Sequence, residues 1–185
     1  MPSLKEKYNK EVIPQMVKVF GYKNTMAVPK ILKVVINTCF GKTAVTKTSG
    51  EREKMQNLIM QDLALIAGQK PKLVKAKKSI AGFKLREGLE IESMVTLRKS
   101  KMWDFLERLV YLSFPRSRDF KGIDQKTIDK KGNLNIGFRE HISFSEIFAE
   151  KEKTIFGLEI TIVTNAKSKE EGLELYKLLG FPMKT

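Results

Sequence analysis

The chain has 185 residues and 42% hydrophobic content, which excludes general disorder and suits one core, so we expect a single domain over residues 1–185. Lys and Arg total 35 against 21 Asp and Glu, and the net charge of +14 favours nucleic acid as the partner over an acidic protein or a membrane surface. No apolar run approaches the roughly 18 residues that span a membrane.

The first predicted elements are a helix and a strand. Apolar residues recur every four positions from Leu4 to Phe20, which predicts a helix that Gly21 ends and that Pro14 kinks or divides in two. Alternation over 31–37 predicts a strand with two unlike faces. The face expected beneath helices carries Leu32, Val34 and Ile36. The other face carries Ile31, Lys33, Val35 and Asn37.

The middle of the chain predicts a polar connection over 41–50 and a helix from about Glu51, for which Gly68 is a C-cap. The apolar stripe of this helix consists of Met55, Leu58, Ile59, Leu63 and Ile66. Two strands, over 72–76 and 89–97, then flank a basic loop that contains Ala81 and Gly82.

The second half of the chain predicts a helix over 101–114 that Pro115 ends, strands over 134–139 and 158–164, and an irregular or briefly helical stretch over 143–153. A last helix begins at a capping box formed by Ser168 and Glu171 and closes at Gly180. The helix stripe over 101–114 consists of Met102, Phe105, Leu106, Leu109 and Val110. This order predicts an α+β fold: a mixed, mainly antiparallel sheet with helices packed on one face and an open second face.

Residues with catalytic or metal-binding potential are few. Phe40-Gly41-Lys42-Thr43 resembles the end of a phosphate-binding loop, but Ile36 stands where that motif needs its first glycine. The single histidine, His141, is interpreted as a surface or packing residue, and the single cysteine, Cys39, as a small buried residue that excludes an intramolecular disulfide. The acidic stretch of Glu146, Glu150 and Glu152 is interpreted as solvated. We therefore expect no enzyme, no metal and no cofactor, and, without an apolar leader after Met1, an intracellular protein.

Basic residues, in contrast, are clustered. No acidic residue occurs from 63 to 86, a stretch that is either a solvated charged face or, as we favour, an RNA-contacting loop. Its cations are Lys70, Lys72, Lys75, Lys77, Lys78, Lys84 and Arg86. Gly82 permits close approach of a ligand, and Phe83 is either a stacking platform for a base or a core anchor.

Two further features have polar character. Arg116, Arg118 and Lys121 follow the helix over 101–114, where they suit a phosphate, the helix carbonyls or a protein partner. Lys33, Asn37 and Thr96 are expected on the open side of the sheet. There they either hydrogen-bond 2′-hydroxyls and base edges of a folded RNA or form an ordinary solvated sheet face.

Along essentially its whole length the sequence resembles the family of large-subunit ribosomal protein number five, the bacterial-type 5S rRNA-binding protein of the central protuberance. The segments that carry the resemblance are Gly68-Gln-Lys-Pro71, Lys75-Ala-Lys-Lys-Ser-Ile-Ala-Gly-Phe-Lys84, Val95-Thr-Leu-Arg98, Met102-Trp-Asp-Phe105, Pro115-Arg-Ser-Arg-Asp-Phe120, Gly132-Asn133, Gly137-Phe-Arg-Glu140 and Ala166-Lys-Ser-Lys-Glu-Glu-Gly172. One departure is Cys39, which replaces a family glycine and is expected to keep the backbone that this glycine allows.

The resemblance implies a non-enzymatic constituent of the large subunit of the cytoplasmic ribosome, in contact with large-subunit rRNA and other central-protuberance proteins. The residues it implies for 5S rRNA are Lys33, Asn37, Gln69, Thr96 and Arg98. Those it implies for a loop that reaches P-site tRNA are Lys75, Lys77, Lys78, Ser79, Phe83 and Lys84. Those it implies for an intersubunit bridge with a small-subunit head protein are Arg116, Arg118, Lys121 and Asn133. The competing hypotheses are a non-specific basic RNA-binding protein and an RNA-modifying enzyme, which needs a cofactor pocket or convergent carboxylates.

Overall fold

The computed structural model describes residues 3–118, 120–147 and 155–184, and its centre is a five-stranded sheet in the order β2-β3-β1-β5-β4. The strands are β1 (Ile31–Cys39), β2 (Lys72–Lys75), β3 (Glu90–Leu97), β4 (Leu134–Phe138) and β5 (Leu158–Thr164). All four pairings between neighbours are antiparallel. The predicted α+β fold is confirmed.

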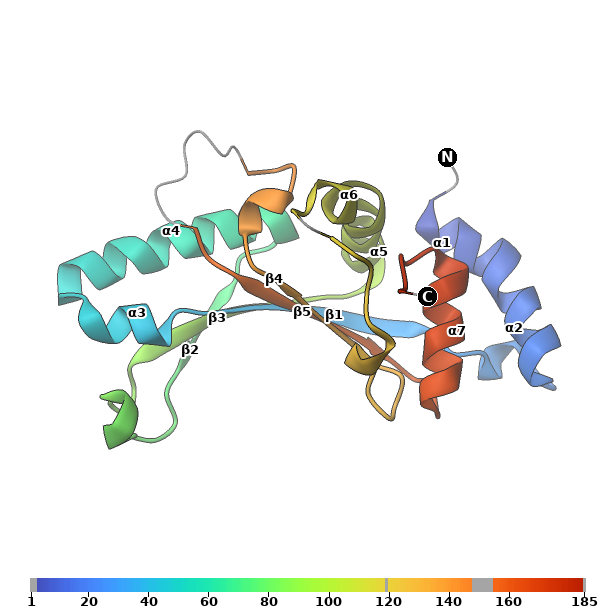
Figure 1. Ribbon diagram of the computed structural model, residues 1–185, viewed down its shortest axis with the longest axis horizontal. Helices are drawn as coiled ribbons and strands as arrows, with labels where there is room; N and C mark the ends of the chain where they lie inside the picture. Colours follow the sequence, from blue (N-terminus) through green and yellow to red (C-terminus); the bar gives the residue numbers. More distant parts are fainter. Residues whose placement is uncertain (1–2, 119, 148–154, 185) are drawn as a thin grey trace.

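The helices leave one face of the sheet open (Figure 1). They are α1 (Leu4–Lys7), α2 (Ile13–Phe20), α3 (Gly41–Thr46), α4 (Ser49–Ala67), α5 (Lys99–Arg108), α6 (Phe114–Arg116) and α7 (Lys169–Leu179). In Figure 1, α4, α5 and α6 lie on one side of the sheet, whereas α1, α2 and α7 gather beside one of its ends. None of the helices in the described part of the chain is long and apolar enough to cross a membrane.

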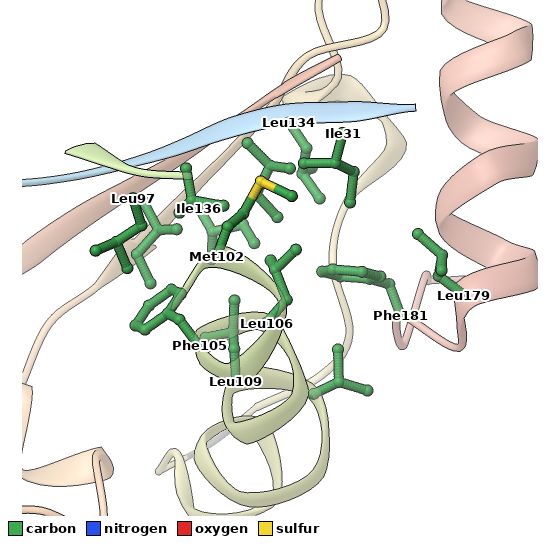
Figure 2. Close-up of a cluster of buried hydrophobic side chains, with 14 of the residues drawn as sticks. Ile31, Leu97, Met102, Phe105, Leu106, Leu109, Leu134, Ile136, Leu179 and Phe181 are labelled. Atoms are coloured by element: carbon green, nitrogen blue, oxygen red, sulfur yellow. The ribbon is translucent and has the colours of Figure 1, made fainter. Parts of the chain in front are cut away.

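The main hydrophobic core lies between the sheet and α5 (Figure 2). Met102, Phe105 and Leu106 of α5 are almost fully buried against strand residues such as Leu97 and Leu134. Each such side chain contributes about 1.5–3 kcal/mol when it leaves water. Every residue of the stripe predicted for this helix is buried, so the helix fixes which face of the sheet is covered.

Two helical runs, one over residues 4–20 and one over residues 99–116, contain a proline that is preceded by a π-helical segment. In the first run η1 (Tyr8–Val12) precedes Pro14, and in the second η4 (Leu109–Ser113) precedes Pro115. A proline lacks an N–H and its ring crowds the carbonyl one turn earlier, and a widened turn relieves both problems. Each proline thus lies inside the α-helix that follows the π-helical segment: the first run is interrupted before Pro14, within the helix predicted to be kinked or divided, and Pro115 does not end the second run as predicted.

Further predictions about local structure are wrong. Leu32 is 43% exposed rather than covered, and Ile31 is buried in the core rather than on the open face, because the register shifts between Ile31 and Lys33. The expected polar connection over 41–50 contains α3 and the start of α4. Leu58 is 45% exposed because it lies beside the stripe that runs through the buried residues of α4.

Capping residues determine where α4 begins and ends and where α7 begins. Thr48 and Glu51 form a reciprocal capping box, so α4 begins earlier than predicted, and Gly68 ends it in the left-handed conformation. At α7 the Ser168 hydroxyl accepts from the Glu171 N–H as predicted. The Glu171 carboxylate, however, accepts from the N–H of Lys167 rather than from that of Ser168.

Candidate nucleic-acid interface

The uncovered side of the sheet, which we call the open face, is formed by alternate residues of all five strands. Its members are Lys33, Val35, Asn37, Cys39, Lys72, Val74, Glu92, Met94, Thr96, Asn135, Gly137, Glu159, Thr161 and Val163. All of them are partly or fully exposed, whereas the residues between them, such as Val34, Ile36 and Ile160, are mostly buried. This alternation is that of a sheet with one solvated face.

The structure brings together three of the residues predicted to bind 5S rRNA. Asn37 of β1 and Thr96 of β3 lie on adjacent strands, because Asn37 is opposite Met94 and Thr96 is opposite Val35. The side-chain Nε2 of Gln69, just beyond α4, donates to the carbonyl of Thr96 at 3.4 Å. The end of α4 therefore adds an amide to the edge of the open face.

Asn37 has unmet hydrogen-bonding capacity. Its Oδ1 is buried and has no hydrogen-bond partner among the described residues. Leaving a polar atom in this state costs about 1–3 kcal/mol. Rotation of the side-chain amide exchanges oxygen and nitrogen, so Asn37 can present either an acceptor or a donor.

Lys33 and Arg98 lie at the other end of the same two strands. Lys33 precedes Val34, which pairs with Leu97, and Arg98 follows Leu97 and caps α5. Arg98 is exposed and Lys33 is half-buried. These two cations therefore stand at one border of the open face, away from Asn37.

The open face itself carries no excess of positive charge. Its cations are Lys33 and Lys72, and its carboxylates are Glu92 and Glu159. The positive charge that favours nucleic acid lies instead around the face, on the loop between β2 and β3 and near the end of α6. A balanced face with amides and hydroxyls is better suited to hydrogen-bonded recognition than to neutralising phosphate.

Cys39 is exposed on the open face, so its interpretation as a buried residue is wrong. The alternation of β1 places Thr38 beneath the helices and Cys39 opposite Glu92 on the other side. Cys39 belongs to regular strand and is absent from the residues with positive φ, which in the described chain include only two besides glycines, Lys84 and Lys99. The cysteine therefore replaces glycine without backbone strain.

Residues 75–89, which we call the basic hairpin, extend from β2 and β3 away from the helices (Figure 1). The hairpin is closed by its own backbone: Ile80 and Leu85 exchange hydrogen bonds, and the N–H of Ala76 donates to the carbonyl of Leu89 at 2.8 Å. The Ser79 hydroxyl accepts from the N–H of Glu87 at 2.9 Å. This predicted tRNA-contacting serine therefore also stabilises the hairpin.

The basic hairpin presents cations and one aromatic ring to solvent. Its exposed cations are Lys75, Lys77, Lys78, Lys84 and Arg86. Phe83 lies in the short 3-10 turn η3 (Ala81–Phe83) and is 71% exposed, so it is not a core anchor. Exposed cations beside an exposed ring are the features that hold phosphates and stacked bases.

The third predicted group does not form one cluster. Arg116 is exposed at the end of α6, while Arg118 and Lys121 line a hollow of about 570 Å³ between residues 117–127 and the edge strand β4. The Asn133 side chain is hydrogen-bonded within the protein: its Oδ1 accepts from the N–H of Thr164 at 2.9 Å and its Nδ2 donates to Asp129 at 2.8 Å. Its predicted role at a bridge stays a prediction.

The turn that contains Asn133 is packed against α7. Gly132 has φ of +72°, and a Cβ on Gly172 would lie 2.5 Å from the Cα of Gly132. The Tyr176 hydroxyl contacts the carbonyl of Gly132 at 3.0 Å. The two glycines therefore allow the backbones of the turn and the helix to touch, which fixes this end of β4.

His141 is a packing residue. It is completely buried, stacks on Phe156 at 3.9 Å, and its Nδ1 accepts from the N–H of Phe156 at 3.4 Å. The interpretation of Glu146 as solvated is wrong, because it forms an ion pair with Arg108, while Glu150 and Glu152 lie outside the described residues. Within the described residues no three His, Cys, Asp or Glu side chains are placed to hold a metal ion.

Glu159 and Gly137 were not predicted to lie on the open face. Each lies in the same cross-strand row as Asn37. Alternation within a strand predicts which residues share a side, but it does not reveal which strands are neighbours. The antiparallel register between β1 and β5 is needed to place Glu159 beside Asn37.

Comparisons with known proteins match the same family along the chain. A family model described as Ribosomal protein L5 matches residues 24–86, and a second model, which describes the C-terminus of the same ribosomal family, matches residues 90–183. The large ribosomal subunit protein uL5 of Geotalea daltonii is 50% identical over 184 residues, covering 100% of this chain and 99% of the relative. Proteins of the same name from Desulforapulum autotrophicum and Halothermothrix orenii are 49% and 47% identical, the latter covering 98% of each chain. The chain therefore belongs to the ribosomal protein L5 family.

Proposed function

We propose that the protein binds 5S rRNA in the central protuberance of the large ribosomal subunit through the open face of its sheet. As a member of the L5 family it is a structural, rRNA-binding constituent of the large subunit in the cytoplasmic ribosome and not an enzyme. The mechanism of such a protein is positioning, in which polar side chains hold a folded RNA in one orientation.

The observation that carries the proposal is the placement of Asn37 and Thr96 on one uncovered surface, with Gln69 hydrogen-bonded to the backbone carbonyl of Thr96 beside it. Helices α4, α5 and α6 lie on the opposite side of the sheet and α1, α2 and α7 lie beside one of its ends, so a ligand reaches the open face without unfolding any of these helices. The surface is nearly balanced in charge, which limits non-specific attraction and leaves hydrogen bonding to select the RNA. Lys33 and Arg98 then supply phosphate contacts at its border.

The basic hairpin is proposed to reach P-site tRNA. It projects away from the sheet and presents Lys75, Lys77, Lys78 and Lys84 together with the exposed ring of Phe83. Lysines bind the backbone of any RNA, which suits a contact that must accept every tRNA. The internal bonds of the hairpin, including that of Ser79, hold these groups in one shape.

The remaining partners are proposed from the residues around β4. Arg116, Arg118 and Lys121 lie near the hollow at the free edge of the sheet, where they suit the bridge to a small-subunit head protein. Asn133 shapes the neighbouring turn through Asp129 rather than offering a free amide. Other surfaces are left for large-subunit rRNA and further proteins of the central protuberance.

The test is binding of purified protein to 5S rRNA and to a structured RNA of equal length, across a salt series. We expect binding to 5S rRNA that stays selective at physiological salt, and loss of this selectivity in the Asn37→Ala/Thr96→Ala variant. Equal binding of both RNAs that disappears together with rising salt indicates a non-specific basic protein and contradicts the proposal.

A further inference from the structure

One row of cross-strand partners crosses the entire open face. From edge to edge it contains Lys72, Met94, Asn37, Glu159 and Gly137. Partners on one face have Cβ atoms about 4.5–5.5 Å apart. The carboxylate of Glu159 therefore stands between the side-chain amide of Asn37 and a position on β4 that has no side chain.

Glu159 is out of place on a surface that meets a polyanion. It is exposed, and it takes part in no ion pair within residues 3–118, 120–147 and 155–184. Contact with RNA brings phosphates near this carboxylate and removes its water, and both effects oppose binding. A carboxylate at the centre of such a contact is compatible with tight binding only if the RNA supplies hydrogen-bond donors to it.

Among unpaired bases, guanine supplies the donors that fit a carboxylate. Its Watson–Crick edge carries N1–H and an N2 amino group side by side, which match the two carboxylate oxygens. Adenine and cytosine each present one amino group beside an acceptor nitrogen, and uracil presents one N–H between two carbonyls. Bases in loops and bulges offer this edge to proteins because no partner strand occupies it.

The open face has room for a base next to Glu159. A Cβ built on Gly137 meets no atom within 4 Å, and Gly137 does not have the positive φ that would require glycine. Gly137 also lines the hollow of about 570 Å³ at the edge of the sheet. Its missing side chain therefore leaves space above the sheet rather than serving the backbone.

We propose that Glu159 accepts two hydrogen bonds from the Watson–Crick edge of one unpaired guanine, which lies over Gly137, while Asn37 contacts the same nucleotide. The inference rests on the proposed function, that is, on binding of 5S rRNA by the open face. It assigns base specificity to Glu159, whereas the surrounding lysines and arginines contribute affinity without selecting a sequence.

The sign of the effect of Glu159→Gln tests the proposal. The substitution removes one negative charge, so a carboxylate that only faces solvent or phosphate predicts equal or tighter binding of 5S rRNA. A carboxylate that reads guanine predicts about 10- to 100-fold weaker binding, because the new amide group opposes a guanine donor. Glu92→Gln, the same change on the same face beside Cys39, is the matched control and is expected not to weaken binding.

The RNA side is tested by interference mapping. A pool of 5S rRNA with inosine at a small, random fraction of guanine positions is separated into bound and free molecules for each protein. Inosine lacks the N2 amino group, so we expect a guanine at which inosine interferes with wild-type protein but not with Glu159→Gln. Identical interference patterns for both proteins, or undiminished binding by Glu159→Gln, overturn the inference.

The two proposals fail in different ways. If wild-type protein does not distinguish 5S rRNA from the structured control RNA, the proposed function fails and this inference falls with it. If wild-type protein is selective and Glu159→Gln is equally selective, only the guanine contact is wrong. Thermal unfolding of both variants verifies that they are folded, which their exposed or half-exposed strand positions favour.

Discussion

Asp129 shows how a single exposed carboxylate shapes a loop. Its Oδ1 accepts from the N–H groups of Lys131 and Asn133, both at 2.8 Å, and its Oδ2 accepts from the Asn133 side chain. Partial burial raises the pKa of this carboxyl, but the hydrogen bonds from Asn133 and Lys131 outweigh it and hold the pKa below 3.8. The turn before β4 therefore depends on an ionised Asp129.

We expect Asp129→Asn to lower the free energy of unfolding at neutral pH. A folded-state pKa below the unfolded value contributes stability above about pH 3.8 that is lost as pH falls through the folded pKa. The difference between wild type and variant in urea unfolding should therefore shrink on acidification. Asp124→Asn is the control, since that residue accepts one backbone N–H, from Lys126, and should show a smaller change. A pH-independent difference for Asp129→Asn would contradict this account.

At the scale of elements, the fold was largely predictable because periodicity and caps are local. The strands over 134–139 and 158–164 and the cap at Gly68 follow from spacing and residue type alone. The predictions that were wrong concern features that depend on tertiary contacts. The bulge that turns Leu32 outward forms against a neighbouring strand, and the short helix α3 precedes α4 in the folded chain. Short helices lack a strong periodic pattern of their own.

The contact between α7 and the turn before β4 predicts that a glycine-to-alanine substitution in a helix lowers the stability of the protein instead of raising it. Glycine to alanine normally stabilises a helix by roughly 0.5–1 kcal/mol. Gly172→Ala should instead destabilise the protein by about 1–3 kcal/mol, because its Cβ would meet the Cα of Gly132 at 2.5 Å. Gly50→Ala, in α4 with no atom within 4 Å of the new Cβ, should follow the normal rule. Chemical denaturation compares the two, and a stabilising Gly172→Ala would show that the backbones separate easily.

For the whole molecule, the positions of the positive charge could be predicted more fully from the sequence than the composition of the open face. The basic loop is contiguous in the chain, so its cations could be predicted directly. The open face gathers side chains from five strands, and its order follows from pairings between distant segments. Alternation within the strands predicted Asn37 and Thr96 on the open side and the family resemblance also implied them, whereas the place of Glu159 required the register between β1 and β5.

The two proposed RNA contacts should be separable. Alanine at Lys75, Lys77 and Lys78 removes three charges from the basic hairpin, which lies outside the open face. We expect binding of free 5S rRNA to change by less than about threefold at physiological salt, while peptide synthesis by reconstituted ribosomes slows through the tRNA contact.

The control carries alanine at the exposed Lys126, Lys130 and Lys131, which removes the same charge elsewhere. Peptide synthesis should be less affected in this variant than in the hairpin variant. If the hairpin variant lost as much 5S rRNA affinity as Asn37→Ala/Thr96→Ala, the proposed division of roles would be wrong.

The continuity of the basic hairpin with the sheet has a mechanical consequence. The hairpin is anchored by β2 and β3, and β3 is paired with β1 from Glu92 to Leu97. A pull on the hairpin tip is therefore carried along β3 as shear, with the inter-strand hydrogen bonds loaded together rather than one after another. The same strand holds Met94 and Thr96 on the open face. A displacement of the hairpin tip is therefore expected to strain β3 at the positions of these two residues.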